Sequence, residues 1–183
     1  MRCARLAAAL TTLVLVLGAT QDIARAASSA EIDRDVTAAI AKMYQTVPNS
    51  KQLASKAKGI LVFPTIVKAG FLFGAQYGEG GLRRNGRPAG YYTSVAASYG
   101  LQAGIQAFGY ALFFMSDSAL KYLDTSSGFE VGVGPSVVVL DTGMAKALTT
   151  TTMQHDIYAV FFHQQGLMAG AGIQGTKITR MDR

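Results

Sequence analysis

Few side chains in this sequence could act as general acids or bases. The 183 residues include two histidines, His155 and His163, and three glutamates, Glu31, Glu79 and Glu130. The histidines lie eight residues apart, without the nucleophile and carboxylate pattern that a hydrolase needs. We expect structural or surface roles for both and predict no catalytic residues, with a hydrolase that uses either histidine as the alternative. A metal site needs three or four ligands at a recognisable spacing, so we predict no metal and no cofactor.

Glu79 is the most interesting carboxylate because it lies in a glycine-rich run, Tyr77–Gly81. Such a carboxylate could accept backbone N–H groups and brace a turn, or it could pair with Lys68 or an arginine. A catalytic acid would need a second carboxylate at a fixed spacing, and none is evident. We therefore predict that Glu79 braces the fold.

Residues 170–175 read Gly-Ala-Gly-Ile-Gln-Gly, which matches the glycine pattern of dinucleotide-binding proteins. The match follows a predicted strand, as that motif requires. The eight residues after it hold neither the helix and next strand nor the acidic residue about 20 positions further on. We predict no nucleotide cofactor.

Basic residues cluster at three places in the sequence. Each basic side chain near an anionic membrane contributes about 1 kcal/mol, so three or four together would matter, although such clusters can also be ordinary solvated charge. Nucleic acid is not predicted as a partner, because no nucleic-acid-binding signature occurs. The clusters are Lys51, Lys56 and Lys58; Arg83, Arg84 and Arg87; and Lys177, Arg180 and Arg183.

Residues 1–26 have the layout of a cleavable secretory signal. Arg2 and Arg5 precede Leu6–Ala19, which holds no charge, and the small-x-small triplet Ala24-Arg25-Ala26 follows, so cleavage is expected after Ala26. A membrane anchor is the alternative, but a spanning helix needs about 20 apolar residues. We expect an exported protein of the periplasm or the outer-membrane periphery.

Removing residues 1–26 changes the net charge and the cysteine content of the chain. The formal charge of +6 falls to +4, because three arginines and one aspartate leave. The only cysteine, Cys3, precedes the apolar run, so it cannot carry the lipid of a mature lipoprotein. The mature chain then lacks cysteine, which excludes a disulfide framework and suits an oxidising compartment.

The rest of the chain, 27–183, is predicted as one domain with a helical start at 27–58. Ser28 and Glu31 form a capping box, and an apolar stripe at three- and four-residue spacing follows until Pro48. Ser50 is expected to cap a second, short helix that stops at Gly59. The stripe is Ile32, Val36, Ile40, Met43 and Val47.

Residues 59–183 are glycine-rich and show strand signals. Asn85-Gly86 is a strong hairpin signal, and a short helix is predicted near 116–124, capped by Ser116 or Asp117. Glycines two or four residues apart would mark bulges or close backbone approach. We therefore predict an α+β fold, with N-terminal helices packed on a curved, mainly antiparallel sheet or partial barrel. Strands are expected at 60–63, closed by Pro64, and at 68–77, 90–99, 104–115, 129–133, 137–140, 157–163 and 167–173.

Six short motifs occur in order along the chain: Gly59–Pro64, Lys68–Phe71, Tyr77–Gly80, Gly90–Tyr92, Gly100–Gly104 and Gly166–Ala169. This ordered set resembles the SYLF domain family, which also occurs next to SH3 domains in yeast and animal actin-patch proteins. The resemblance implies a non-enzymatic module that binds anionic phospholipid, with phosphoinositide-type head groups in the family. An envelope protein-interaction or scaffold module is the alternative, since eukaryotic members bind actin.

The resemblance and the basic clusters together give two sets of residues. The first, expected to contact lipid from the sheet rim and the hairpin, is Lys68, Arg83, Arg84, Arg87, Lys177 and Arg180. The second, expected to be structural, is Gly70, Gly74, Gly78, Glu79, Gly80, Gly104 and Gly166. A lipid inside the curved sheet is a variant of the first expectation, and the oligomeric state is left open.

Overall fold

Three helices and eight strands make up the described part of the computed structural model, which comprises residues 26–71, 73–99, 104–125, 129–131, 133–140, 145–146, 154–166 and 175–183. The helices are α2 (Ser29–Thr46), α3 (Ser50–Lys56) and α4 (Asp117–Thr125). The strands are β1 (Gly59–Phe71), β2 (Phe73–Arg84), β3 (Arg87–Tyr99), β4 (Gly104–Phe114), β5 (Phe129–Glu130), β6 (Val137–Leu140), β7 (Ile157–Gly166) and β8 (Lys177–Met181). Residues 1–25 of the predicted signal segment and the expected strand at 167–173 lie outside the described residues.

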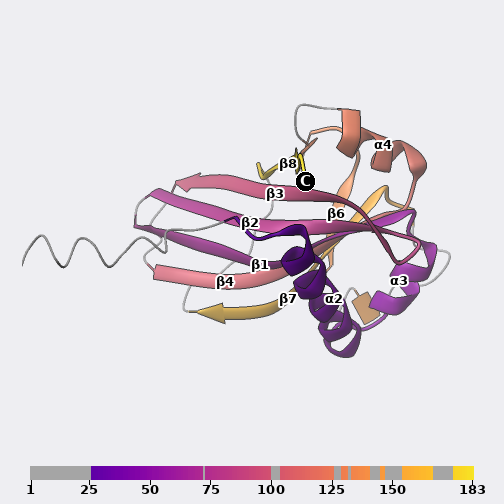
Figure 1. The fold of residues 1–183 in the computed structure, drawn as a ribbon, viewed down its shortest axis with the longest axis horizontal. Helices are drawn as coiled ribbons and strands as arrows, with labels where there is room; N and C mark the ends of the chain where they lie inside the picture. Colours follow the sequence, from indigo (N-terminus) through magenta and orange to yellow (C-terminus); the bar gives the residue numbers. More distant parts are fainter. Residues whose placement is uncertain are drawn as a thin grey trace, which may run out of the picture.

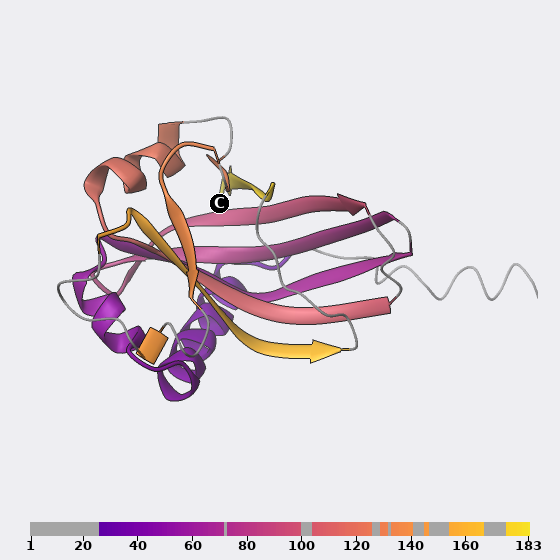
Figure 2. The same cartoon turned by 180° about the vertical axis from the view of Figure 1, so that it is seen from behind.

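All eight strands join one curled sheet in the order β5-β8-β3-β2-β1-β4-β7-β6 (Figure 1). Every pairing is antiparallel except that of β6 with β7. The predicted α+β class with a curved, mainly antiparallel sheet is therefore confirmed. The long strands β1 to β4 extend away from the helices, which gather at one end of the sheet (Figures 1 and 2).

The N-terminal helix forms as its sequence predicts. Ser28 caps α2, and the hydroxyl and backbone N–H of Ser28 exchange hydrogen bonds with Glu31 in a capping box. The second helix differs from the prediction, because its N-cap is Asn49, in a left-handed conformation, and not Ser50. The Ser50 hydroxyl instead donates to the carbonyl of Val47, 2.7 Å away, and so braces the turn between the helices.

The first strand does not end at Pro64, as the sequence had suggested. β1 continues to Phe71, and Pro64 lies at a register shift between Val62 and Val67, where a bulge accommodates a residue without a backbone N–H. The predicted strand 68–77 is also wrong. Residues 68–77 instead form the end of β1, a tight turn and the start of β2, and Phe71 pairs with Phe73 across the turn.

Glycines on β2 face the bulge of β1 at very short range. A Cβ added at Gly78 would lie 2.5 Å from the carbonyl oxygen of Thr65, and one at Gly80 would overlap the carbonyl oxygen of Val62. The expectation that glycines mark bulges and close backbone approach is confirmed here. At the other end of β2, Asn85 and Gly86 form the predicted hairpin turn with φ values of 51° and 75°.

The sheet carries a hydrophobic core on each face. On the inner face, Ala119, Leu120 and Leu123 of α4 belong to one cluster with large strand side chains such as Phe63, Phe108 and Phe114. On the outer face, α2 and α3 cover Val62, Phe113 and their neighbours. The buried α2 positions are Ile32, Val36, Ala39 and Met43, so the predicted stripe is the packed face. No described helix is long and apolar enough to cross a bilayer.

Candidate functional site

A groove of about 530 Å³ opens where α2, α3 and the β2–β3 hairpin meet. Its walls are largely apolar, with Ile40 and Tyr44 from α2 and Ala54 from α3. Its far side is formed by the turn at Asn85 and Gly86. A volume of this size falls within the range of small-molecule sites.

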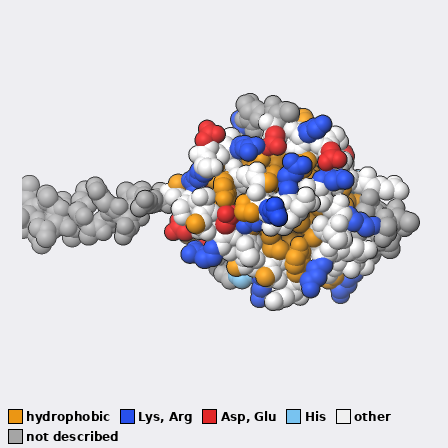
Figure 3. All heavy atoms as spheres, turned by 45° about the vertical axis from the view of Figure 1, so that its right-hand side comes forward, with side chains coloured by type: hydrophobic (Ala, Val, Ile, Leu, Met, Phe, Trp, Pro, Cys, Tyr) orange, Lys and Arg blue, Asp and Glu red, His pale blue; other side chains and the backbone are white. Residues whose placement is uncertain are grey.

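Basic side chains flank this groove. Lys56 and Lys58 lie at the end of α3 and beyond it, next to the lining residues, and Arg84 and Arg87 lie on either side of the hairpin turn. All four are exposed, and none forms an ion pair with a described residue. Figure 3 turns this end of the molecule toward the reader and shows Lys and Arg side chains around an exposed apolar area. We call the groove with these four residues the basic groove.

Arg83, although part of the predicted cluster, does not face solvent. Its side chain is 7% exposed and pairs with Asp33 of α2, with Nη1 2.7 Å from Oδ1. The other oxygen of Asp33 accepts a hydrogen bond from the Tyr91 hydroxyl at 2.8 Å, and this bond, together with burial, raises the pKa of Tyr91. Arg83 thus fastens α2 to the sheet.

Arg84 and Arg180 lie near α4, but among acidic neighbours. Arg180 donates to Asp124 over 3.0 Å, and Asp124 also accepts from the Tyr92 hydroxyl at 2.7 Å. Arg84 lines a hollow of about 260 Å³ with Lys121, Asp117 and Asp124. Because both basic and acidic side chains line this hollow, it should attract an anion less strongly than the basic groove does.

Lys68 lies far from these arginines, on the inner face of β1. It is 9% exposed and shares a cross-strand row with Gln76 and Gln106, which are 5% and 4% exposed. Gln76 donates to Thr176, whereas the buried Oε1 of Gln106 has no hydrogen-bond partner among the described residues. Lys177 is exposed and pairs with Val95 in register, on the opposite face of the sheet.

The six predicted lipid contacts therefore do not share one surface. Arg83 lines the groove but is buried and paired with Asp33. Arg84 and Arg87 flank the hairpin turn at the rim of the basic groove, and Arg84 also lines the hollow beside α4, where Arg180 is ion-paired. Lys68 and Lys177 lie toward the other end of the strands.

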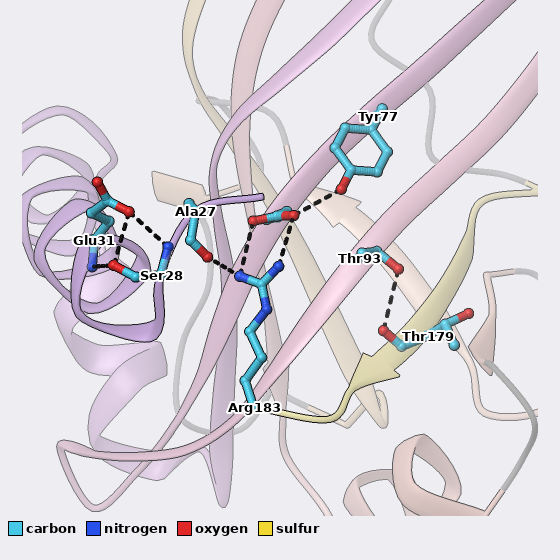
Figure 4. A network of polar contacts seen from close by, with 8 residues as sticks. Ala27, Ser28, Glu31, Tyr77, Thr93, Thr179 and Arg183 are labelled. Carbon is cyan, nitrogen blue, oxygen red and sulfur yellow. Dashed lines mark hydrogen bonds and ion pairs between the residues drawn. The ribbon is translucent and has the colours of Figure 1, made fainter. Parts of the chain in front are cut away.

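Glu79 connects distant parts of the chain. It lies within β2 and not in a turn, and it accepts a hydrogen bond from the Tyr77 hydroxyl at 2.8 Å. It also pairs with Arg183 across 3.4 Å, and Arg183 donates to the carbonyl of Ala27 (Figure 4). Glu79 thus joins the C-terminal residue to the start of α2, the arginine pairing that was one of its predicted roles.

The remaining predicted structural residues lie at the strand ends. Gly70 pairs with both Gly74 and Gly104 in register, and Gly166 pairs with Gln106 at the end of β7. A Cβ at Gly70 would lie 2.5 Å from the Gly74 Cα, so the tight β1–β2 turn depends on this glycine.

The histidines occupy separate places. His155 is exposed before β7 and stacks edge-on with Tyr158, and His163 is an exposed β7 residue with a φ of 57°. Within the described residues, no three His, Cys, Asp or Glu side chains are placed to hold a metal ion.

Sequence reasoning missed the groove itself. Ile40 was assigned to the packed stripe of α2, but it and Tyr44 also line the groove. The Lys56 and Lys58 cluster was recognised, yet nothing in the sequence placed it beside the Arg84 and Arg87 hairpin. The only available signal was that both clusters border glycine turns.

Comparison with known families gives one match. Residues 95–183, from within β3 to the last residue, match the family model Ysc84, described as Las17-binding protein actin regulator. No curated protein matches the chain. The matched segment includes the Gly100–Gly104 and Gly166–Ala169 motifs on which the SYLF resemblance partly depends. Residues 95–183 therefore match the Ysc84 family, the SYLF-domain family that the sequence motifs resemble.

Proposed function

We propose that this chain is an exported, non-catalytic domain that binds anionic phospholipid at the basic groove. The observation that carries the proposal is an apolar groove flanked by exposed basic residues without described ion-pair partners. A phospholipid needs both features, because its acyl chain must leave water and its phosphate seeks positive charge. The SYLF resemblance supports the same ligand class.

Vesicle co-sedimentation tests this proposal. The full chain should bind vesicles that contain phosphatidylglycerol more tightly than neutral phosphatidylcholine vesicles, and added salt should weaken the difference. Reversing three groove charges, in Lys56→Glu, Lys58→Glu and Arg84→Glu together, should lower anionic binding at least about tenfold, since each contributes about 1 kcal/mol.

Arg34→Glu is the matched control for the groove variant. Arg34 is also an exposed arginine, but it lies on α2 in an ion pair with Asp35 and does not line the groove. Its reversal should change vesicle binding much less. Equal losses in both variants would show only a general charge effect and would refute the basic groove as the site.

A protein partner is the second candidate function, because the matched family is described as a Las17-binding actin regulator. Co-sedimentation of the purified chain with actin filaments tests it directly. Filament binding that survives the groove charge reversals would favour this candidate, and its absence would favour lipid.

A further inference from the structure

Apolar side chains cover the outer face of the sheet at the end opposite the basic groove. Side chains alternate between the two faces of a strand, and residues paired across strands share a face. Val95 of β3, Tyr77 of β2 and Val67 of β1 therefore form one row, because each pairs with the next. Nearer the strand ends, a second row contains Ala97, Ala75, Ala69 and Ile105, and Phe73 lies beyond it.

These rows are open to solvent. Phe73 is 72% exposed and Ile105 is 70% exposed, while Tyr77, Val67 and Val95 are close to half exposed. The alanines of the second row are exposed as well. We call this surface the strand-tip patch, made up of Val67, Ala69, Phe73, Ala75, Tyr77, Val95, Ala97 and Ile105.

The same end of the molecule is almost without charge. Residues 69–78 and 96–116 contain no Asp, Glu, Lys or Arg, and neither do residues 157–176. The strands of these segments meet at the tip, where Gly70 pairs with Gly74 and Gly104. Because charged residues normally fill exposed surface, an uncharged end with large exposed apolar side chains marks an interaction surface.

The side chains are ordered by polarity along the strands. The two most exposed apolar residues, Phe73 and Ile105, lie nearest the tip. Tyr77 and Lys177 lie one level behind them, in the row of Val67 and Val95, and Lys68 lies at a similar level on the inner face. The Glu79–Arg183 ion pair follows further back.

This order matches the depth profile of a membrane interface. Acyl chains accept Phe and Ile, whereas Tyr and Lys favour the headgroup level, where an aromatic body or a carbon stem meets a polar tip. Ion pairs remain in water. A face-to-face contact between two copies would instead place the largest apolar side chains at the centre of the face, not at its far edge.

We propose that the strand-tip patch inserts into a lipid bilayer end-on, with Phe73 and Ile105 among the acyl chains and Tyr77 and Lys177 at the headgroups. This goes beyond the proposed function, because the inserting end lies a strand length, about 40 Å, from the basic groove. It also does not require anionic lipid, since the patch gains free energy by removing apolar surface from water.

A single tryptophan reports which end enters the bilayer, because the chain contains none. In the full chain, Phe73→Trp should shift its emission to shorter wavelength on phosphatidylcholine vesicles and should be quenched by acyl-chain bromines. Val139→Trp is the matched control, since Val139 is 43% exposed on β6 and outside the patch. Tyr44→Trp reports on the basic groove.

The outcomes separate this inference from the proposed function. A response of Phe73→Trp alone on neutral vesicles supports insertion, even if the groove binds no lipid. A response of Tyr44→Trp on anionic vesicles, with Phe73→Trp unchanged on all vesicles, supports the groove and overturns insertion. An equal response of Val139→Trp also overturns it, because the binding would then not be specific to the tip.

A second variant pair measures the affinity. Phe73→Ser with Ile105→Ser should lower binding to neutral vesicles at least about tenfold, whereas Val139→Ser should not. Sedimentation velocity without lipid shows whether two copies cover the patch instead. A dimer that the double variant converts to a monomer, together with unchanged vesicle binding, would overturn the proposal.

Discussion

Arg83 and Arg84 are neighbours in the sequence but have different roles, one buried in an ion pair and the other exposed. The residues are adjacent in sequence, but strand alternation sends their side chains to opposite faces of β2. Arg83 lines the groove on the α2 face and is buried against Asp33, while Arg84 is exposed on the α4 face beside Asp117 and Lys121. The sequence contained this distinction, because the two-residue period applies wherever a strand is predicted, but a count of clustered charges hides it.

Replacing Arg83 with methionine should destabilise the fold. Methionine keeps an apolar stem but lacks the guanidinium group. In the parent chain, that group donates to both the carboxylate and the backbone carbonyl of Asp33. We expect a loss of about 1–3 kcal/mol in the free energy of unfolding, measured by urea denaturation. Arg84→Met is the control and should stay within about 0.5 kcal/mol of the parent. Equal losses would contradict the assigned roles.

Buried tyrosines predict a loss of stability at alkaline pH. Burial raises the pKa of both Tyr110 and Tyr92 above the ordinary value of 10. The folded state therefore holds these protons more tightly than the unfolded state, so the stabilisation is complete below pH 10 and is lost as the pH rises above it.

Urea denaturation across this pH range measures the effect, and Tyr110→Phe should flatten the decline. Tyr110 is fully buried and bonds to Ser94 at 2.8 Å, so the variant costs some stability at neutral pH. Its slope above pH 10 is the informative quantity. A slope that matches the parent would show that Tyr110 does not carry the effect.

At the level of elements, the β1–β2 hairpin explains why strand prediction partly failed. Phe71 pairs with Phe73, so odd-numbered residues face outward on both sides of the turn. The two-residue alternation therefore continues through the turn, and the sequence reads as one strand over 68–77. The capping box of α2, the Asn85-Gly86 turn and the bounds of β6 were predicted correctly because each has a local signal.

Gly78 should not tolerate a side chain, because its neighbour is backbone. In Gly78→Ala the new Cβ would lie 2.5 Å from the carbonyl oxygen of Thr65, where only movement of β1 could relieve the clash. We expect a loss of about 1–3 kcal/mol in the free energy of unfolding.

Gly81→Ala is the matched control on the same strand. Its Cβ would approach nothing closer than the Val36 side chain at 3.3 Å, so the thermal midpoint should fall much less. If Gly78→Ala had the same thermal midpoint as the parent chain, the backbone of β1 would have to move at the bulge without loss of stability, which would contradict the prediction.

At the scale of the whole molecule, the two ends of the sheet have opposite character. One end carries helices, a groove and basic residues, and the other carries the uncharged strand-tip patch. This polarity could not be predicted from sequence, because it depends on pairings between residues far apart, such as Ala69 with Ile105. The fold class needed only local periodicity and glycine placement.

The secretory-signal pattern of residues 1–26 predicts that this segment is cleaved during export. When the full chain is expressed in a bacterium with an outer membrane, the periplasmic protein should begin at Ala27, as intact-mass spectrometry would show. Ala24→Lys places a large charged residue in the small-x-small triplet and should leave the precursor uncut. Recovery of uncut parent chain from the cytoplasm would contradict export.

The sheet order has a consequence for the sequence of folding events. Residues 154–183 supply both β7, which borders β4, and β8, which borders β3. The central strands β3, β2, β1 and β4 thus keep two open edges until the final 30 residues arrive. Such distant pairings raise the contact order, so we expect slow folding that is completed only after residues 154–183 have been synthesised. In the export that we propose, slow folding would keep the chain unfolded while it passes through a narrow secretion channel.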